Sequence, residues 1–479
     1  MKKRIISGVL TLAMTMALVL GLGMVPANSM EVRAEGTIAS ASCKLLDGST
    51  VQYSATLSGS PASDDGQLYL FQLKTYQYSI PAGAGALATC SVSTNPVFKF
   101  PLEGQEAGGR LYAKYALAAK QGGSMVMLGA PQYISNPEVL ATNTHRVQRP
   151  AKTTVGAELS NLEINGSGTG NIAPGSIKHT VQILCKAGTT VTNPKASGGD
   201  SHSVQHHYYM LNAANDAGIE GLVRDMKTYA NSAGQDFIIG NEVNERIWNY
   251  MRWTDWQDYM NEYVQAFRVC YTAIKSTNAQ ARVYISLDQN WDRNRPQGHG
   301  EYYTYLDGAD FINMFNSSIC AGGNIDWDLA IHPYTVPLTY AKFWDMSGLS
   351  GGDYYAKQIN NNAMVSFQNM TVITGFMQQG HLKNRNGATR DIIINEFGVS
   401  NAQGEDVQIA AICAAYYAFS KNPSITQLMY LSSAGYGVDS TLSGRAAEVY
   451  NALGTGAGDQ YMAWAKQYIG ISDWSQVIR

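Results

Sequence analysis

From about residue 180 to the end of the chain, short apolar segments alternate with longer stretches that have the periodicity of amphipathic helices. This alternation constrains the fold more than any other feature, because it is the pattern of parallel strands connected by helices. Strands from residue 236 onward begin 46, 44, 65 and 36 residues apart, more than the ~30 residues of a strand–helix–strand unit. We therefore predict an α/β fold with strands at 180–185, 236–240, 282–287, 326–331, 391–395 and 427–431.

The region over residues 36–140 has a different pattern, that of an all-β domain. Its short alternating segments are rich in β-branched and aromatic residues, and clusters of Gly, Pro, Ser and Asp separate them. Such spacing predicts a β-sandwich of the immunoglobulin-like kind, with a structural or substrate-binding role that includes contact with a glycan or a cell wall. A polar link near 143–152 leads to a second domain over 151–479. The predicted strands of the front domain are 50–57, 67–73, 96–102, 110–117 and 125–134.

The chain starts with basic residues, continues with an apolar stretch over 5–24 and then offers small residues up to Ala34. This layout is typical of a secretory signal peptide over residues 1–34. A membrane anchor is the alternative, although a small-residue cleavage motif at 25–27 directly follows the apolar stretch. No later apolar run is long enough to span a bilayer. We therefore expect a bacterial protein that is secreted, extracellular and without membrane contact after cleavage.

Charge and cysteine content exclude several classes of partner. The 34 basic and 37 acidic residues nearly balance, so nucleic acid is not an expected partner. The six cysteines show no metal-ligand spacing, and His202, His206 and His207 lack the regular spacing of a zinc site. We therefore expect no metal and no cofactor. Cys43 and Cys90 both lie in the front domain, and their pairing is left open.

Two of the predicted strands end in a glutamate that follows an asparagine. Residues 236–240 lead into Asn241 and Glu242, and residues 391–394 lead into Asn395 and Glu396. If parallel order is kept, these are the fourth and seventh strands of a barrel, so the glutamates face one another across its mouth. Glycosidic bond cleavage with retention needs one protonated and one ionised carboxyl group ~5 to 5.5 Å apart. Two glutamates in this arrangement therefore favour catalysis over the alternative of solvated loop residues.

The Asn-Glu after the fourth strand and the Glu-Phe-Gly after the seventh resemble the clan A glycoside hydrolases, retaining enzymes built on a (β/α)8 TIM barrel. The likeness covers residues 151–479. Three longer strings are also similar to a family of secreted bacterial TIM-barrel proteins known only as a domain of unknown function. They are Ile-Ile-Gly-Asn-Glu-Val-Asn, Val-Tyr-Ile-Ser-Leu-Asp and Trp-Asp-Leu-Ala-Ile-His-Pro-Tyr.

The resemblance to the clan implies roles for individual residues. Glu242 would be the acid/base and Glu396 the nucleophile, while Asn241 would hold the 2-hydroxyl of the sugar. Tyr334, at the end of the sixth strand, would donate a hydrogen bond to the nucleophile, with His332 beside it.

The loop after the fifth strand supplies further candidate substrate-binding residues. Asp288 and Trp291 lie there, followed by Arg293 and Arg295, and Asn244 lies two residues after Glu242. Carboxylates and amides bind sugar hydroxyls, whereas planar side chains stack on apolar sugar faces. Trp291 is the preferred stacking platform, with packing beneath the loop as the alternative. Trp248 and Trp253 are weaker candidates.

Two departures from the clan pattern keep a second function in view. The eighth strand ends in Tyr430-Leu431-Ser432-Ser433 without the clan's aromatic platform, and only two predicted strands, near 157–164 and at 180–185, precede the fourth. The first quarter of the barrel is therefore expected to be shortened or rearranged.

We expect a secreted retaining glycoside hydrolase that cleaves an extracellular or cell-surface polysaccharide by two-glutamate double displacement. A catalytically inactive carbohydrate-binding or surface protein on a degenerate TIM barrel is the alternative. A metal-dependent hydrolase would need His or Asp ligands at strand ends, where only His332 qualifies.

Overall fold

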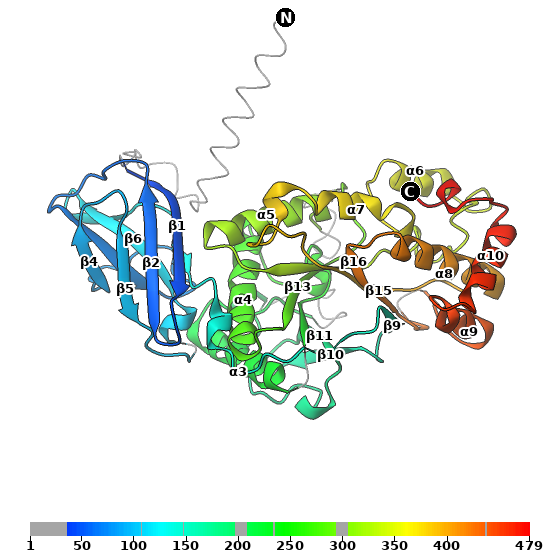
Figure 1. Ribbon diagram of the computed structural model, residues 1–479, viewed down its shortest axis with the longest axis horizontal. Coiled ribbons are helices and arrows are strands. Elements are labelled where there is room, and N and C mark those ends of the chain that lie inside the picture. Colours follow the sequence, from blue (N-terminus) through cyan, green and yellow to red (C-terminus); the bar gives the residue numbers. More distant parts are fainter. Residues whose placement is uncertain are drawn as a thin grey trace, which may run out of the picture.

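A computed structural model describes residues 36–106, 108–146, 148–196, 208–232, 235–293, 305–435 and 438–479. The expected signal peptide, the three histidines at 202–207 and Arg295 lie outside the described residues. Figure 1 shows an all-β body formed by the N-terminal strands, beside a larger body of strands and helices.

The front body consists of two antiparallel sheets that share one core. Phe100 of one sheet meets Tyr115 of the other, with ring centroids 4.9 Å apart. Cys43 and Cys90 lie on different sheets and are free thiols. The immunoglobulin-like topology stays a prediction. One sheet has the order β1 (Ile38–Leu45), β2 (Thr50–Leu57) and β5 (Val97–Pro101); the other has β4 (Ala88–Ser91), β3 (Gln67–Leu73), β6 (Lys114–Gln121) and β7 (Ser124–Met127), with β8 (Gln132–Tyr133) paired to β6.

The larger body is built on an eight-stranded parallel sheet that curls like a barrel (Figure 1). Its strand order is β10-β11-β12-β13-β14-β15-β16-β9, and a single parallel bridge between Val155 and Leu159 links its two end strands. In chain order, β12 is the fourth strand of this sheet and β15 the seventh, as predicted. The strands are β9 (Lys152–Thr154), β10 (Leu159–Ile164), β11 (Thr180–Cys185), β12 (Asp236–Ile239), β13 (Arg282–Leu287), β14 (Trp327–Ile331), β15 (Ile392–Phe397) and β16 (Ile425–Tyr430).

The first quarter of this sheet lacks covering helices. Three strands precede β12, because the three-residue β9 adds to the two predicted ones. Only residues 155–158 separate β9 from β10, and the β10–β11 connection contains one short 3-10 helix, η3 (Pro174–Ser176). A helical crossover between parallel strands needs a dozen or more residues. The shortened first quarter therefore results from missing helices and a very short first strand.

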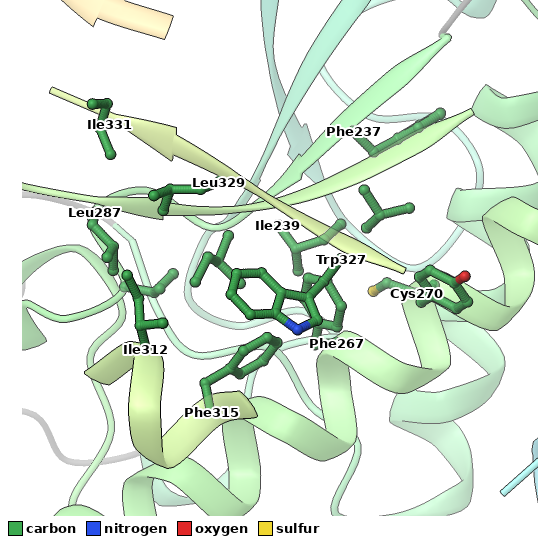
Figure 2. Close-up of a cluster of buried hydrophobic side chains, with 14 of the residues drawn as sticks. Phe237, Ile239, Phe267, Cys270, Leu287, Ile312, Phe315, Trp327, Leu329 and Ile331 are labelled. Atoms are coloured by element: carbon green, nitrogen blue, oxygen red, sulfur yellow. The ribbon is translucent and has the colours of Figure 1, made fainter. Parts of the chain in front are cut away.

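Helices pack on the outer face of the remaining strands. Figure 2 shows Trp327 of β14 against Phe315 of α5 and Phe267 of α4. The Phe315 ring lies 5.3 Å from Trp327 and 5.0 Å from Phe267, measured between centroids. Buried aromatic area of this kind is the main force that holds helices to a sheet. The helices are α3 (Asp216–Asn231), α4 (Trp256–Thr277), α5 (Gly308–Ala321), α6 (Gly352–Asn360), α7 (Thr371–Phe376), α8 (Glu405–Ser420), α9 (Gly444–Ala452) and α10 (Gly458–Ile469).

A buried ion-pair network closes the amino-terminal end of the sheet. Arg149, from the link between the two bodies, binds Asp236 at 2.7 Å and Asp391 at 3.3 Å. Tyr284 donates a 2.6 Å hydrogen bond to Asp391, and Arg282 pairs with the same carboxylate. Asp236 and Asp391 lie at the starts of β12 and β15. The network therefore ties together the two strands that carry the glutamates.

The front body is anchored to the barrel-like body through its last strand and the following turn. The backbone N–H of Tyr133 donates to Gly322 at 2.9 Å, and the Arg268 guanidinium lies 4.6 Å from the Tyr133 ring centroid. Arg385 pairs with Glu138 at 2.6 Å. Between the two bodies lies a cavity of about 450 Å³. In the described part of the chain, no helix is long and apolar enough to cross a membrane.

Candidate active site

The loop after β12 turns sharply at Glu242. Gly240 and Glu242 have φ values of 87° and 41°, a region that residues other than glycine rarely occupy. The neighbouring strand holds this turn: the Val243 N–H donates to the Ser286 carbonyl at 2.7 Å, and the Glu242 N–H donates to Ser286 Oγ at 3.3 Å. Backbone strain maintained in this way is characteristic of functional sites.

Glu242 is bound to a histidine inside the sheet. His332, directly after β14 and 1% exposed, places Nδ1 2.8 Å from Glu242 Oε1 and Nε2 3.4 Å from Ser286 Oγ. The Glu242 side chain is 16% exposed. The Glu242 side chain is therefore partly exposed, and His332 holds one of its carboxyl oxygens.

Glu396 is hydrogen-bonded to Tyr334, which lies two residues after His332 beyond the end of β14. The Tyr334 hydroxyl donates a 2.5 Å hydrogen bond to Glu396 Oε1. Burial, followed by the nearby Glu396 charge, raises the pKa of Tyr334 well above its usual value, so the hydroxyl remains a donor at neutral pH. The His332 and Tyr334 ring centroids are 6.5 Å apart. The structure thus brings both glutamates, His332 and Tyr334 together around the end of β14.

The surroundings of Glu242 and His332 raise the pKa of both groups. Burial raises the pKa of Glu242; the His332 hydrogen bond opposes this shift, and the charges of Asp288 and Glu396 add to it. Burial disfavours the charged form of His332, but the carboxylates of Glu396 and Glu242 prevail and raise its pKa to about 9. A protonated Glu242 can accept a hydrogen bond from His332 at Oε1 and donate from its other oxygen.

Asn241 is held by β11 and by its own loop. Gln182 donates a 2.6 Å hydrogen bond to Asn241 Oδ1, and Asn249 donates to its carbonyl at 2.6 Å. The side chain is half-buried. Its orientation is therefore set before any substrate enters, as the predicted contact with a sugar hydroxyl requires.

Asn244 and Asp288 bind each other. Asn244 Nδ2 donates to Asp288 Oδ1 at 2.6 Å, and the Asp288 N–H donates to Asn244 Oδ1 at 3.1 Å. Asn244 has 0% exposure, so the prediction that it binds substrate is wrong: its amide joins two loops. Asp288 is 8% exposed and also accepts from the Asn290 amide. Its contact with substrate stays a prediction.

Trp291 is not a stacking platform. Its side chain is 5% exposed and packs edge-to-face on Phe376, with centroids 5.1 Å apart. The alternative, packing beneath the loop, is what the structure shows, because the large apolar ring gains more from burial than from exposure.

Three polar residues near the glutamates were missed from the sequence. Ser286 and Gln182 lie within strands and give only a weak signal, a single polar residue among apolar neighbours. Glu245 lies three residues after Glu242, where burial and a hydrogen bond with Asp288 raise its pKa well above the usual value. Among the described residues, no three His, Cys, Asp or Glu side chains are grouped as metal ligands.

The curled parallel sheet, with two glutamates at its carboxyl edge, places the chain among the α/β proteins built on a barrel-like parallel sheet. Residues 172–477 match the model of the Family of unknown function (DUF5722), and the chain belongs to that family. A comparison with curated proteins finds no match.

The solved structures similar to this chain include glycoside hydrolases, all at low identity. A β-D-glucuronidase from Dictyoglomus thermophilum is 10% identical with a TM-score of 0.29, over 90% of this chain and 69% of that one. A family 39 glycoside hydrolase from the gut symbiont Bacteroides cellulosilyticus is 11% identical with a TM-score of 0.34, over 80% and 74%. A GH128 endo-β-1,3-glucanase from Sorangium cellulosum is 12% identical with a TM-score of 0.32, over 66% and 98%. The likeness is distant and carries no information about substrate.

Proposed function

We propose that this protein is a retaining glycoside hydrolase acting on an extracellular or cell-surface polysaccharide. One observation carries the proposal: both glutamates are held by hydrogen bonds from a single strand end, Glu242 by His332 at 2.8 Å and Glu396 by Tyr334 at 2.5 Å. This arrangement supplies one carboxyl group that can hold a proton and one that is oriented as an anion, which is the pair that double displacement needs.

In the proposed reaction, the Glu396 carboxylate attacks the anomeric carbon while Glu242 gives its proton to the leaving oxygen. The Glu242 carboxylate formed in this step is stabilised by the His332 imidazolium. Glu242 then removes a proton from water, whose oxygen bonds to the anomeric carbon as the bond between that carbon and Glu396 breaks, and the sugar leaves with its configuration retained. Tyr334 keeps the Glu396 carboxylate in place throughout.

The proposed location outside the cell rests on the basic and apolar pattern of residues 1–34. The front body would then contact the polymer or the cell wall.

A carbohydrate-binding protein without catalysis is the second candidate function. The end of β16 favours it, because Tyr430 is fully buried and its hydroxyl donates to the Ser440 carbonyl at 3.0 Å. This tyrosine cannot serve as the sugar platform that the clan carries at this position.

Replacing each glutamate separately tests the proposal. We expect Glu242→Ala to lower turnover of glycosides with poor leaving groups by ~10²–10⁴-fold and to keep activity where the leaving group needs no proton. Glu396→Ala should abolish the covalent intermediate and, with azide, give a product of inverted configuration. Product analysis by NMR on a panel of glycans measures both effects.

Asp459→Asn, an exposed change on α10, is the matched control and should behave like the wild type. If the wild type binds glycans but hydrolyses none of the panel, or if both glutamate variants keep full activity, catalysis by this pair is refuted.

A further inference from the structure

The loop after β13 lies beside the proposed acid/base. Asn290 donates a 3.2 Å hydrogen bond to Glu245 Oε1, and Asn244 donates to Asp288. Asn244 and Glu245 lie two and three residues after Glu242 in the chain. The leaving sugar must lie next to the group that protonates it. The loop after β13 therefore adjoins the proposed position of the leaving sugar.

This loop is fastened to the segment that follows α6. The Trp291 N–H donates to the Ala363 carbonyl at 3.0 Å, and the Val365 N–H donates to the Gln289 carbonyl at 2.8 Å. Arg293 Nη1 donates to the Met364 sulfur at 3.4 Å. This backbone pairing holds the segment that follows α6 against the loop after β13.

Helix α6 carries an exposed aromatic ring beside this loop. Tyr354 of α6 is 48% exposed, in contrast to the buried Trp291. The Arg293 guanidinium lies 5.9 Å from its ring centroid, and the Tyr355 ring packs against it with centroids 5.4 Å apart. Within the described residues, Arg293 forms no ion pair with a carboxylate. The ring is thus oriented by its neighbours, and most guanidinium donors remain available.

Building on the proposed function, we propose that Tyr354 and Arg293 form a distal sugar-binding subsite on the leaving-group side of the proposed active site. The tyrosine ring stacks on an apolar sugar face while the guanidinium donates to hydroxyl groups. Arg293 lies three residues beyond Asn290, at most ~10 Å of extended chain. The subsite is therefore close to the loop that adjoins the proposed acid/base.

The ratio of two rates tests the subsite. The measured quantity is kcat/KM on a neutral polysaccharide divided by kcat/KM on an aryl glycoside whose leaving group is a single ring. We expect this ratio to fall roughly 5- to 10-fold in Tyr354→Ala and in Arg293→Gln. The control is Tyr468→Ala on α10, which removes an equally exposed tyrosine and should leave the ratio unchanged. An unchanged ratio in the Tyr354 and Arg293 variants, or an equal fall in the control, overturns the proposal.

A binding experiment separates this inference from the proposed reaction. In the Glu396→Ala background, gel retardation by a panel of neutral and acidic soluble polysaccharides measures binding without hydrolysis. Weaker retardation by a neutral polysaccharide in Tyr354→Ala supports the subsite even if the wild type hydrolyses nothing. Equal retardation with and without Tyr354 by every polymer of the panel overturns the subsite.

Discussion

His332 determines the electrostatics of the site at the scale of single residues. Its ring is 1% exposed and lies between Ser286 and Glu242, where an isolated imidazolium would be strongly disfavoured by burial. The carboxylates of Glu396 and Glu242 reverse this preference and raise its pKa to about 9. The histidine therefore carries a positive charge at neutral pH beside the two groups that the proposed reaction uses.

Stability should depend on pH through His332. Because its pKa is higher in the folded state than the ordinary 6.5, its contribution is fully present below pH 6.5 and is lost as the pH rises through about 9. We expect the free energy of unfolding to fall by on the order of 3 kcal/mol over this range. Urea titrations of the wild type and of His332→Gln at several pH values measure it.

The His332→Gln variant should lack this slope, whereas His381→Gln, at an exposed histidine, should retain it. The same slope in wild type and His332→Gln would show that the imidazole is not the titrating group.

At the scale of elements, the two strands with glutamates at their ends are joined at their beginnings. Arg149, with an 8% exposed side chain, bridges the buried carboxylates of Asp236 at the start of β12 and Asp391 next to β15. Strand positions at one end of a sheet determine positions at the other, because the hydrogen-bonded backbone between them is stiff. The network at the amino-terminal end thus contributes to the alignment of Glu242 and Glu396.

Removing Arg149 should be costly for stability. Arg149→Ala leaves two buried carboxylates without this partner, so we expect a loss of ~3–5 kcal/mol in the free energy of unfolding. Arg146→Ala is the matched control: Arg146 also binds Asp236, at 2.8 Å, but its side chain is 27% exposed, and we expect a loss of about 1 kcal/mol. Chemical denaturation measures both, and equal losses would contradict a special role for the bridging arginine.

At the scale of the whole molecule, the buried apolar residues of the front body and of the larger body form one continuous cluster. Phe100 and Tyr115 lie inside the front body, whereas Tyr133 and Glu138 make contacts across the boundary with Arg268 and Arg385. Polar contacts of this kind are typical of interfaces between domains, and the continuous apolar cluster adds to the stability that the two bodies share.

We expect residues 36–140 to fold when expressed alone, with a lower unfolding midpoint than in the full chain because the contacts of Tyr133 and Glu138 are lost. Circular dichroism and limited proteolysis of the fragment measure this. An unfolded fragment would mean that the larger body is needed to complete its core.

Sequence periodicity alone was sufficient for six of the eight parallel strands and for the glutamates that follow β12 and β15, since alternating apolar segments and their polar ends are local properties of the chain. It missed β9, whose three residues are too few to show a period, and placed the neighbouring β10 only roughly. It also favoured exposure of Trp291, because nothing local shows that residues 363–365 cover the loop after β13.

Contacts between residues far apart in the chain, such as His332 with Glu242 and Gln182 with Asn241, depend on how the sheet curls. Sequence by itself therefore determined the order of the strands and the residues at their ends, whereas only the tertiary structure decided which of those side chains meet, since packing and charge act between neighbours in space.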